Sequence, residues 1–498
     1  MTATRAQSVG TVSAAQMPPW EGVPTDLLLG EWRPAGDGRR FEVVDPYDGA
    51  VLAQVADASP ADALAALGAA HAVQPEWQAQ SPRARAAVLR GTFELVTERG
   101  EQLAALLTAE MGKPLHEARA EVAYAADYLH WYAEEALRLD GRTAASPDGR
   151  SRVSVVCEPV GPCLLITPWN FPLAMIARKV APALAAGCTV VLKPAELTPL
   201  SALALAELLR EAGAPTGVVN VVTTTDPAGV AAALTADSRL RKVSFTGSTP
   251  VGRLLLGQCA DNVLRASLEL GGNAPLIVFD DADLDRAVEG ALVAKLRNSG
   301  QSCVAANRLL VHERIADAFV ERFARGMEAA VVGAGTDPAT TVGPLIHAGA
   351  ARKASELVAD AIQRGARLVV GGDAPGGPAG ACFPPTVLDA VPRDARVLHE
   401  EIFGPVAPIV RFASEQEALE LANATPFGLA AYVFTESLAR ATRLTDGLEV
   451  GMVALNQGLL ANVAAPFGGV KQSGLGREGG HEGLLEYASL KYVSQALT

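Results

Sequence analysis

Short apolar runs alternate with amphipathic stretches from about residue 160 onward. The runs "VGPCLLI", "CTVVLK", "GVVNVVTT" and "KVSF" have the length of buried strands. Between and after them, "PLAMIARKVAPALAAG", "TPLSALALAELLREAG", "DPAGVAAALTAD" and "PVGRLLLGQCA" have the length and apolar content of helices. This alternation predicts a parallel sheet with helices on both faces, and such sheets bind ligands at the carboxyl ends of their strands.

A second alternating series follows the segment "LELGGNAPLIVF". It contains the helical "LDRAVEGALVAKLR", the strand "RLLVHE", a long helix from about Arg314, and the strands "ARLVV", "PTVL", "AYVF" and "GMVALN". The series predicts a second α/β domain. Residues 60–138, which precede the first series, are rich in alanine and are predicted to be helical.

Two apolar strands, "RSRVSVVCEPV" and "LKYVSQALT", lie outside both series. Because an exposed strand edge needs a partner, they predict a contact between subunits of a homo-oligomer. Edge strands covered within one subunit are the alternative. Residues 1–21 have no apolar core of a signal peptide and no cleavage pattern, so they are predicted to form a flexible tail.

The composition excludes several classes of protein. A chain of 498 residues, 49% hydrophobic and 19% charged, is long enough for more than one core. Asp and Glu number 55 against 42 Lys and Arg, and no basic run is long enough to bind nucleic acid or acidic lipid. The longest nearly apolar stretch, residues 180–192, is broken by Pro182 and Gly187 and is too short for a membrane span. We expect a cytoplasmic protein that binds neither nucleic acid nor membrane.

The cysteines and histidines argue against disulfides and metals. Six cysteines form no CxxC pair, and seven histidines form no HExxH motif or cluster at zinc spacing, so we expect free thiols and no metal site. Cys303 stands apart, because the polar segment "SGQS" precedes it whereas most other cysteines lie in or beside apolar runs. A free cysteine commonly packs as a small hydrophobe, but this setting makes Cys303 the best candidate for a nucleophile.

Two polar residues sit in apolar surroundings next to predicted strands. Glu269 lies in the apolar "SLELGG", where burial would raise the pKa of its carboxyl and suit it to act as a general base. A buried structural ion pair is the alternative. Asn170 lies between Trp169 and Phe171, where its amide could donate to a developing oxyanion or could bond to its own backbone in a turn.

Two strand ends could hold a nucleotide. In "VLKPAE", Lys193 and Glu196 follow a strand and could bind ribose hydroxyls, or could form a solvated pair. In "FTGSTP", the turn at Gly247 is followed by Ser248 or Thr249 as the helix cap, so free N–H groups could bind a pyrophosphate. The GxGxxG fingerprint is absent, and ordinary strand-to-helix turns look similar.

Taken in order, "TPWNFP", "LKPAELTP", "FTGST", "LELGGNAP", "GQSC", "EEIFGPV" and "PFGGVKQSGLGREGG" resemble the aldehyde dehydrogenase superfamily over nearly the whole chain after the tail. The resemblance implies that Cys303 is the nucleophile and Glu269 the general base for hydrolysis. It also implies an oxyanion hole made by Asn170 and the backbone N–H of Cys303, with Lys179 and Glu478 in a proton relay.

The resemblance further implies NAD as the cofactor, with NADP possible. The residues that it assigns to the cofactor are Ile166, Thr167, Pro168, Trp169, Lys193, Glu196, Gly247, Ser248, Glu401 and Phe403. A carboxylate at Glu196 favours NAD, because it accepts from ribose hydroxyls but repels a 2′-phosphate.

Within the superfamily, "NFPLAMIARKVAPALAAGCTVVLKPAE" and "KLRNSGQSC" are most similar to succinate-semialdehyde dehydrogenases. This similarity implies that Arg178 and Arg297 bind the far carboxylate of a small aldehyde substrate. Ala461 stands where those enzymes often have a serine that touches the same carboxylate, so glutarate semialdehyde is an alternative substrate. A neutral aldehyde also stays open as the substrate, with both arginines then paired to protein carboxylates. A catalytically silent structural or binding protein on the same fold is the rival from a different class.

The resemblance also implies an aldehyde dehydrogenase-like α/β fold, in which the chain is divided into two domains and an oligomerisation segment. A cofactor-binding domain comprises residues 22–138 and 159–268, and a catalytic domain comprises residues 269–474. Residues 139–158 and 475–498 are predicted to form an oligomerisation segment of a dimer or tetramer.

Overall fold

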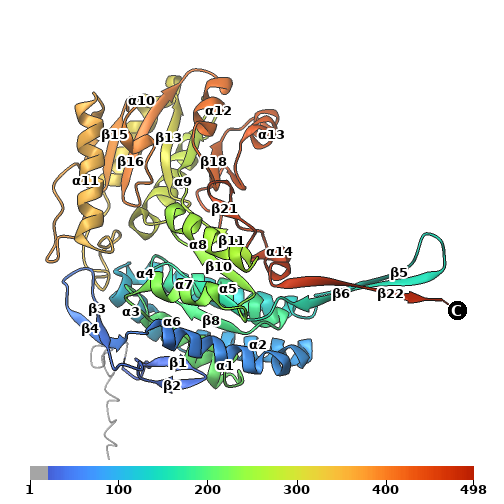
Figure 1. Ribbon diagram of the computed structural model, residues 1–498. Coiled ribbons are helices and arrows are strands. Elements are labelled where there is room, and N and C mark those ends of the chain that lie inside the picture. The colour runs from blue at the N-terminus through green and yellow to red at the C-terminus, as the bar shows by residue number, and fades with distance from the viewer. Residues whose placement is uncertain (1–20, 498) are drawn as a thin grey trace, which may run out of the picture.

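The structure is a computed structural model that describes residues 21–497 (Figure 1). All of the predicted tail except Glu21 therefore lies outside the described residues. Two α/β units, here called the upper and the lower layer, lie one above the other in Figure 1, and each consists of a sheet and its covering helices. A narrow arm of strands projects from the lower layer. Within residues 21–497, no helix is long and apolar enough to cross a membrane.

The lower layer contains an eight-stranded sheet. Its strands, in spatial order, are β2 (Glu31–Arg33), β1 (Leu27–Leu29), β9 (Val219–Val221), β8 (Val190–Lys193), β7 (Cys163–Ile166), β10 (Lys242–Thr246), β11 (Arg265–Glu269) and β21 (Gly474–Leu475). The five strands from β9 to β11 are parallel, and the edge strands are antiparallel. Residues 474–475, which the predicted division placed at the end of the catalytic domain and the start of the oligomerisation segment, thus belong to this first sheet.

Helices cover both faces of the first sheet. They are α1 (Pro60–Ala79), α2 (Pro82–Glu98), α3 (Gly100–Met111), α4 (Leu115–Glu135), α5 (Pro172–Ala186), α6 (Leu200–Glu211), α7 (Pro227–Ala236) and α8 (Thr249–Asp261). In β7, Cys163 and Leu165 pack with α2 to α6, whereas Leu164 and Ile166 pack with α1, α7 and α8. Both faces of β7 are therefore buried, which explains its unbroken apolar run.

Helix α5 is buried along its whole length. It begins at Pro172, where a missing N–H costs no helical hydrogen bond, and it ends at Gly187, whose φ of 96° is left-handed. Its two charged residues, Arg178 and Lys179, are therefore held inside the protein and need buried partners.

The upper layer contains a seven-stranded sheet. Its strands, in spatial order, are β14 (Arg367–Val370), β15 (Thr386–Asp389), β16 (Val406–Phe412), β13 (Ala306–His312), β12 (Ala274–Val278), β18 (Ala430–Phe434) and β19 (Met452–Leu455). All are parallel except β14. The covering helices are α9 (Leu284–Leu296), α10 (Glu313–Glu328), α11 (Ala348–Gln363), α12 (Glu415–Asn423) and α13 (Leu438–Gly447). The predicted fold class, two doubly wound and mainly parallel sheets, is confirmed.

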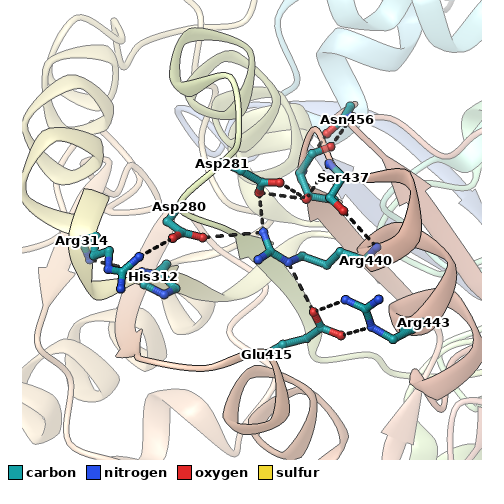
Figure 2. Close-up of polar contacts among 10 residues, drawn as sticks. Asp280, Asp281, His312, Arg314, Glu415, Ser437, Arg440, Arg443 and Asn456 are labelled. Atoms are coloured by element: carbon teal, nitrogen blue, oxygen red, sulfur yellow. Dashed lines mark hydrogen bonds and ion pairs between the residues drawn. The ribbon is translucent and has the colours of Figure 1, made fainter.

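A network of ion pairs lies at the carboxyl ends of strands in the second sheet (Figure 2). Arg440 of α13 lies between Asp281, at 2.5 Å, and Asp280, at 3.6 Å, which follow β12. Its Nε lies 3.4 Å from Glu415 of α12. At this edge of the second sheet, ion pairs therefore link the residues that follow β12 to helices α12 and α13.

The projecting arm is a three-stranded antiparallel sheet of β5 (Arg142–Ala145), β6 (Ser151–Pro159) and β22 (Ala488–Ala496) (Figure 1). The two outlying strands of the sequence thus pair with each other along nine residues each. Much of β22 is exposed, including Leu490 (68%) and Tyr492 (63%). The remaining short elements are β3 (Arg40–Val44), β4 (Val51–Ala56), β17 (Phe427–Gly428), β20 (Val470–Lys471), α14 (Gly480–Leu485) and the 3-10 helices η1 (Arg297–Gly300) and η2 (Arg396–Leu398).

Candidate active site

A cavity of about 240 Å³ lies between the two sheets. The first sheet contributes residues at the carboxyl ends of its strands, and the second contributes residues just before the amino ends of its strands. The predicted site residues in its wall are Pro168, Trp169, Asn170, Arg178, Gly247, Ser248, Arg297, Cys303, Glu401, Phe403 and Ala461. One cavity therefore brings together residues that span most of the chain.

Cys303 is held by a left-handed turn that follows α9. Asn298, Ser299 and Gly300 have φ values of 55°, 57° and 75°, and a Cβ at Gly300 would lie 2.3 Å from the carbonyl oxygen of Gly404. Cys303 is half-buried and lines the cavity. Burial raises the pKa of its thiol to about 12, Glu269 also raises it, and Arg178 opposes the shift.

Glu269 is the last residue of β11 and lies behind the cavity wall. It is only 3% exposed, and among the described residues neither carboxylate oxygen has a hydrogen-bond partner. Burial, and then the charge of Glu478, raise the pKa of this carboxyl well above its usual value. No ion pair within the described part of the chain satisfies it, so the structure favours the base interpretation over the structural ion pair.

Asn170 lies in the loop between β7 and α5. Its Nδ2 donates to the carbonyl of Gln301 at 3.0 Å, two residues before Cys303. The backbone carbonyl of Asn170 accepts from Lys113 Nζ and from Asn298 Nδ2, each at 2.9 Å. The side-chain amide is therefore held in the wall of the cavity that Cys303 also lines, and one of its hydrogens has no partner among the described residues.

Arg178, which lines the cavity, forms a buried cluster with Lys179 and Glu478. Glu478 pairs through one oxygen with Lys179 and through the other with Arg178 Nε at 2.6 Å. Burial alone would raise the pKa of Glu478, but Lys179 and Arg178 hold it below its usual value. Lys179 also donates to Ser244 Oγ at 3.0 Å. The carboxylate is thus charged and lies between two buried basic groups, and burial lowers the pKa of Lys179.

The two arginines assigned to the substrate differ in their surroundings. Arg178 stacks on the ring of Phe467 at 4.2 Å and is already paired with Glu478. Arg297 lies 5.0 Å from the ring centroid of Phe171, and within residues 21–497 it makes no ion pair. Arg297 is therefore the more available cation in the cavity wall.

The predicted cofactor residues lie along the carboxyl edge of the first sheet and the facing loops. Lys193 Nζ lies 3.4 Å from Glu196 at the end of β8, and the Glu196 side chain is 43% exposed. Ser248 makes no side-chain cap on α8, which leaves N–H groups of the first turn free. Ile166 ends β7, and the buried hydroxyl of Thr167 beside it has no partner among the described residues. These donors and acceptors fit the ribose and pyrophosphate of a dinucleotide.

The facing loop completes this region. Trp169 and Phe403 pack edge to face with their ring centroids 5.4 Å apart. Glu401 accepts from the N–H of Gly272 at 3.2 Å, and burial raises the pKa of its carboxyl to about 7. At Gly247, a Cβ would lie 2.4 Å from the ring of Phe245, so any larger residue there would displace this buried ring.

Sequence reasoning missed several residues of the site. Tyr124, Met175, Ser302 and Phe467 also line the cavity. Lys113, Glu117 and Glu121 hold the loops of Asn170 and Cys303 from behind. No local signal marks them, because their partners lie far away in the sequence.

The fold and the cavity define a two-sheet α/β protein with a free thiol in its cavity, beside residues that fit a dinucleotide. The model of the aldehyde dehydrogenase family matches residues 32–493, and the chain belongs to that family. It is an enzyme that oxidises an aldehyde with NAD(P). The family membership expected from the motifs is confirmed.

Three relatives show the range of similar enzymes. A succinate-semialdehyde dehydrogenase of Paenarthrobacter nicotinovorans is 55% identical over 446 residues, which are 90% of this chain and 99% of that protein. A 3-sulfolactaldehyde dehydrogenase of Pseudomonas putida is 50% identical and covers 94% of this chain and 96% of its own length. A glutarate-semialdehyde dehydrogenase of Pseudomonas putida is 48% identical, with the same coverage of 94% and 96%.

A solved structure has the same fold. The crystal structure of an NADP-dependent enzyme of E. coli superposes with a TM-score of 0.94 at 48% identity. The alignment covers 95% of this chain and 98% of that one.

Proposed function

We propose that the chain oxidises succinate semialdehyde to succinate and that NAD is its preferred cofactor. The observation that carries the proposal is that Arg178 and Arg297 line the cavity that holds Cys303. A guanidinium offers paired donors that fit a carboxylate. The three relatives are named for aldehydes that carry an anionic group at the far end, which supports the same assignment.

In the proposed reaction, the Cys303 thiolate attacks the aldehyde carbon, and the amide of Asn170 with the Cys303 N–H stabilises the resulting oxyanion. When bound, NAD(P) supplies the acceptor for the hydride that leaves this carbon. Cys303 then carries a thioester, and Glu269 removes a proton from the water that hydrolyses it. Lys179 and Glu478 lie behind Glu269 and would pass that proton onward.

The proposed preference for NAD rests on Glu196. Its exposed carboxylate stands at the end of β8 beside Lys193, where it can accept from both ribose hydroxyls. A 2′-phosphate at the same place would meet a like charge. Glu401 and Phe403 are proposed to contact the nicotinamide side.

Glutarate semialdehyde is the second candidate substrate. Ala461 lines the cavity and offers no hydroxyl to a carboxylate, so nothing at this position fixes the length of the substrate. A neutral aldehyde is the remaining rival, and the pairing of Arg178 with Glu478 is the observation that favours it.

The proposal includes the assembly and the division of the chain. Residues 22–138 and 159–268 would bind the cofactor, residues 269–474 would carry the nucleophile, and residues 139–158 and 475–498 would mediate a dimer or tetramer. The exposed strand β22 supports a contact with a second copy. The six cysteines are all free thiols, which supports a cytoplasmic location.

The test compares aldehydes with and without the anionic group. Arg297→Ala should lower kcat/KM for succinate semialdehyde about ten- to a hundredfold, because it removes charge-assisted hydrogen bonds worth about 1.5 to 3 kcal/mol. Butyraldehyde should lose far less. Arg178→Ala gives a less clean result, because it also removes a partner of Glu478.

Equal losses for both aldehydes would show that Arg297 holds the fold, and the neutral aldehyde would become the leading candidate. Glutarate semialdehyde in the same assay decides between the two acidic substrates. Measuring kcat/KM with NAD and with NADP tests the role given to Glu196, and a tenfold preference for NADP would contradict it.

A further inference from the structure

We infer that Lys113 and Glu121 are positioning residues for Asn170, which they hold in place to stabilise the oxyanion. The inference rests on the proposed role of Asn170. Lys113 follows α3 and Glu121 lies on α4, so both come from the helical segment before the first series of strands and helices.

Lys113 and Glu121 form an ion pair that is closed off from water. Their side chains are 0% and 1% exposed. Lys113 Nζ also donates to the carbonyl of Asn170 at 2.9 Å and lies 4.2 Å from the ring centroid of Phe171. The ammonium thus contacts two successive residues of the loop that carries the amide.

Glu121 fixes the other end of the same loop. One of its oxygens accepts from the N–H of Leu173 at 2.9 Å and of Ala174 at 3.2 Å, in the first turn of α5. The residue at the start of this helix, Phe171, supplies no side-chain cap. A carboxylate from α4 therefore satisfies N–H groups that the helix itself leaves free.

The same helix α4 also holds the turn before the nucleophile. Both carboxylate oxygens of Glu117 accept from the N–H of Asn298 at 3.0 Å. Asn298 Nδ2 in turn donates to the carbonyls of Asn170 and Gln301. The amide and the thiol are thus tied to one helix by separate carboxylates.

A role in positioning explains why a charged pair is kept here. A buried ion pair commonly gives no more stability than well-packed apolar residues of similar volume. It does fix the atoms that it touches, and here those atoms are the carbonyl of Asn170 and the first turn of α5. With its backbone carbonyl held by two donors, the peptide of Asn170 is fixed, and the bond from Nδ2 to the Gln301 carbonyl sets the direction of the side-chain amide.

The first experiment is Lys113→Met in the full chain. We expect kcat for aldehyde oxidation to fall about ten- to a hundredfold, part of the loss seen when an oxyanion donor is removed. KM for the cofactor should stay within about twofold. Alkylation of Cys303 by iodoacetamide, followed by mass spectrometry of its peptide, should also stay within about twofold, because it forms no oxyanion. Lys113→Arg should recover part of kcat, since it keeps a buried donor.

A double-mutant cycle separates this inference from the proposed function. Asn170→Ala should lower kcat, and adding Lys113→Met to it should cause little further loss, because Lys113 acts through Asn170. Full, additive losses would overturn the inference while leaving the role of Asn170 intact. Full activity in Asn170→Ala would instead contradict the proposed function of that residue.

Lys242→Met is the matched control, because Lys242 is also fully buried and lies 3.4 Å from Glu486, away from the cavity wall. It should leave kcat unchanged. If Lys113→Met alone fails to fold, the neutral pair Lys113→Met with Glu121→Gln leaves no unpaired charge and enters the same cycle. Loss of cofactor binding and alkylation together with activity in both variants would show that the pair only holds the fold, and would overturn the inference.

Discussion

Burial works against the charged form of both groups that carry the proposed chemistry. It raises the pKa of the Cys303 thiol to about 12 and the pKa of the Glu269 carboxyl well above its usual value. Without a bound cation, the Cys303 thiol keeps its proton near neutral pH. The nicotinamide of NAD is cationic, so its binding in the cavity would favour the Cys303 thiolate.

This electrostatic setting predicts how the thiol reacts with pH. In the protein without cofactor, alkylation of Cys303 by iodoacetamide should rise about tenfold per pH unit from pH 7 to at least pH 9, because only the thiolate reacts and pH lies below its pKa. Adding NAD at pH 7 should speed the reaction. The rate is read from the modified Cys303 peptide against time, and a plateau below pH 8 without cofactor would contradict the prediction.

At the scale of elements, the two sheets use their edges differently. The carboxyl edge of the first sheet opens on the cavity, as is usual for parallel sheets. The carboxyl edge of the second sheet is filled by Arg440, Asp280, Asp281 and Glu415 (Figure 2). The chemistry of the second sheet is placed at its opposite edge, just before β13 and β16.

The filled edge should matter for stability and not for catalysis. Arg440 is 22% exposed at its side chain, contacts three carboxylates and lies 4.5 Å from the ring centroid of Phe279. Arg440→Met should lower Tm by several degrees and leave kcat/KM unchanged, since it leaves Asp281 without an ion-pair partner and removes one of the partners of Asp280 and of Glu415.

Arg443→Met provides the control for this prediction. Arg443 is 59% exposed and pairs with Glu415 alone, so its loss should change Tm by about 1 °C or less. Thermal unfolding followed by circular dichroism gives both values. Equal changes in Tm for the two variants would show that the network has no special role.

The sequence predicted helices and strands well where one face or both faces of the element are buried. The apolar runs of β7, β8 and β10 read directly as strands because both of their faces are covered. Strands β1 to β4 were not predicted, since they are only three to six residues long. All of them except β1 are also partly exposed, as in β2, whose ends Glu31 and Arg33 face water. Strand β21 has two residues and exists only through its pairing with β11.

The site could be predicted only in part for a related reason. Cys303, Glu269 and Asn170 can be recognised from their local sequence. Cys303 follows a polar segment with a glycine, Glu269 is a charged residue in an apolar strand, and Asn170 is a polar residue between two aromatic ones. Lys113 and Glu121 sit in "MGKPLHEARAEV", which looks like the solvated start of a helix. Lys113 contacts Asn170, 57 residues further along the chain, and no local pattern carries that contact.

At the scale of the whole molecule, the arm of β5, β6 and β22 is the feature that a single copy leaves uncovered. Leu490 and Tyr492 on β22 are 68% and 63% exposed. If a second copy covers them, Leu490→Asp with Tyr492→Asp should lower the mass in solution, because charges would be buried at the contact. Light scattering measures the mass, with circular dichroism as the check on folding. An unchanged mass would contradict the proposed contact.

The buried cluster of Arg178, Lys179 and Glu478 sets a condition on folding during synthesis. The two cations leave the ribosome early, whereas their carboxylate follows 299 residues after Lys179. Until it arrives, burying α5 would enclose two unpaired charges at a cost of several kcal/mol. The first sheet and its helices therefore cannot finish folding until almost the whole chain is translated. A chain that is released from the ribosome before residue 478 would leave this first-translated part incompletely folded.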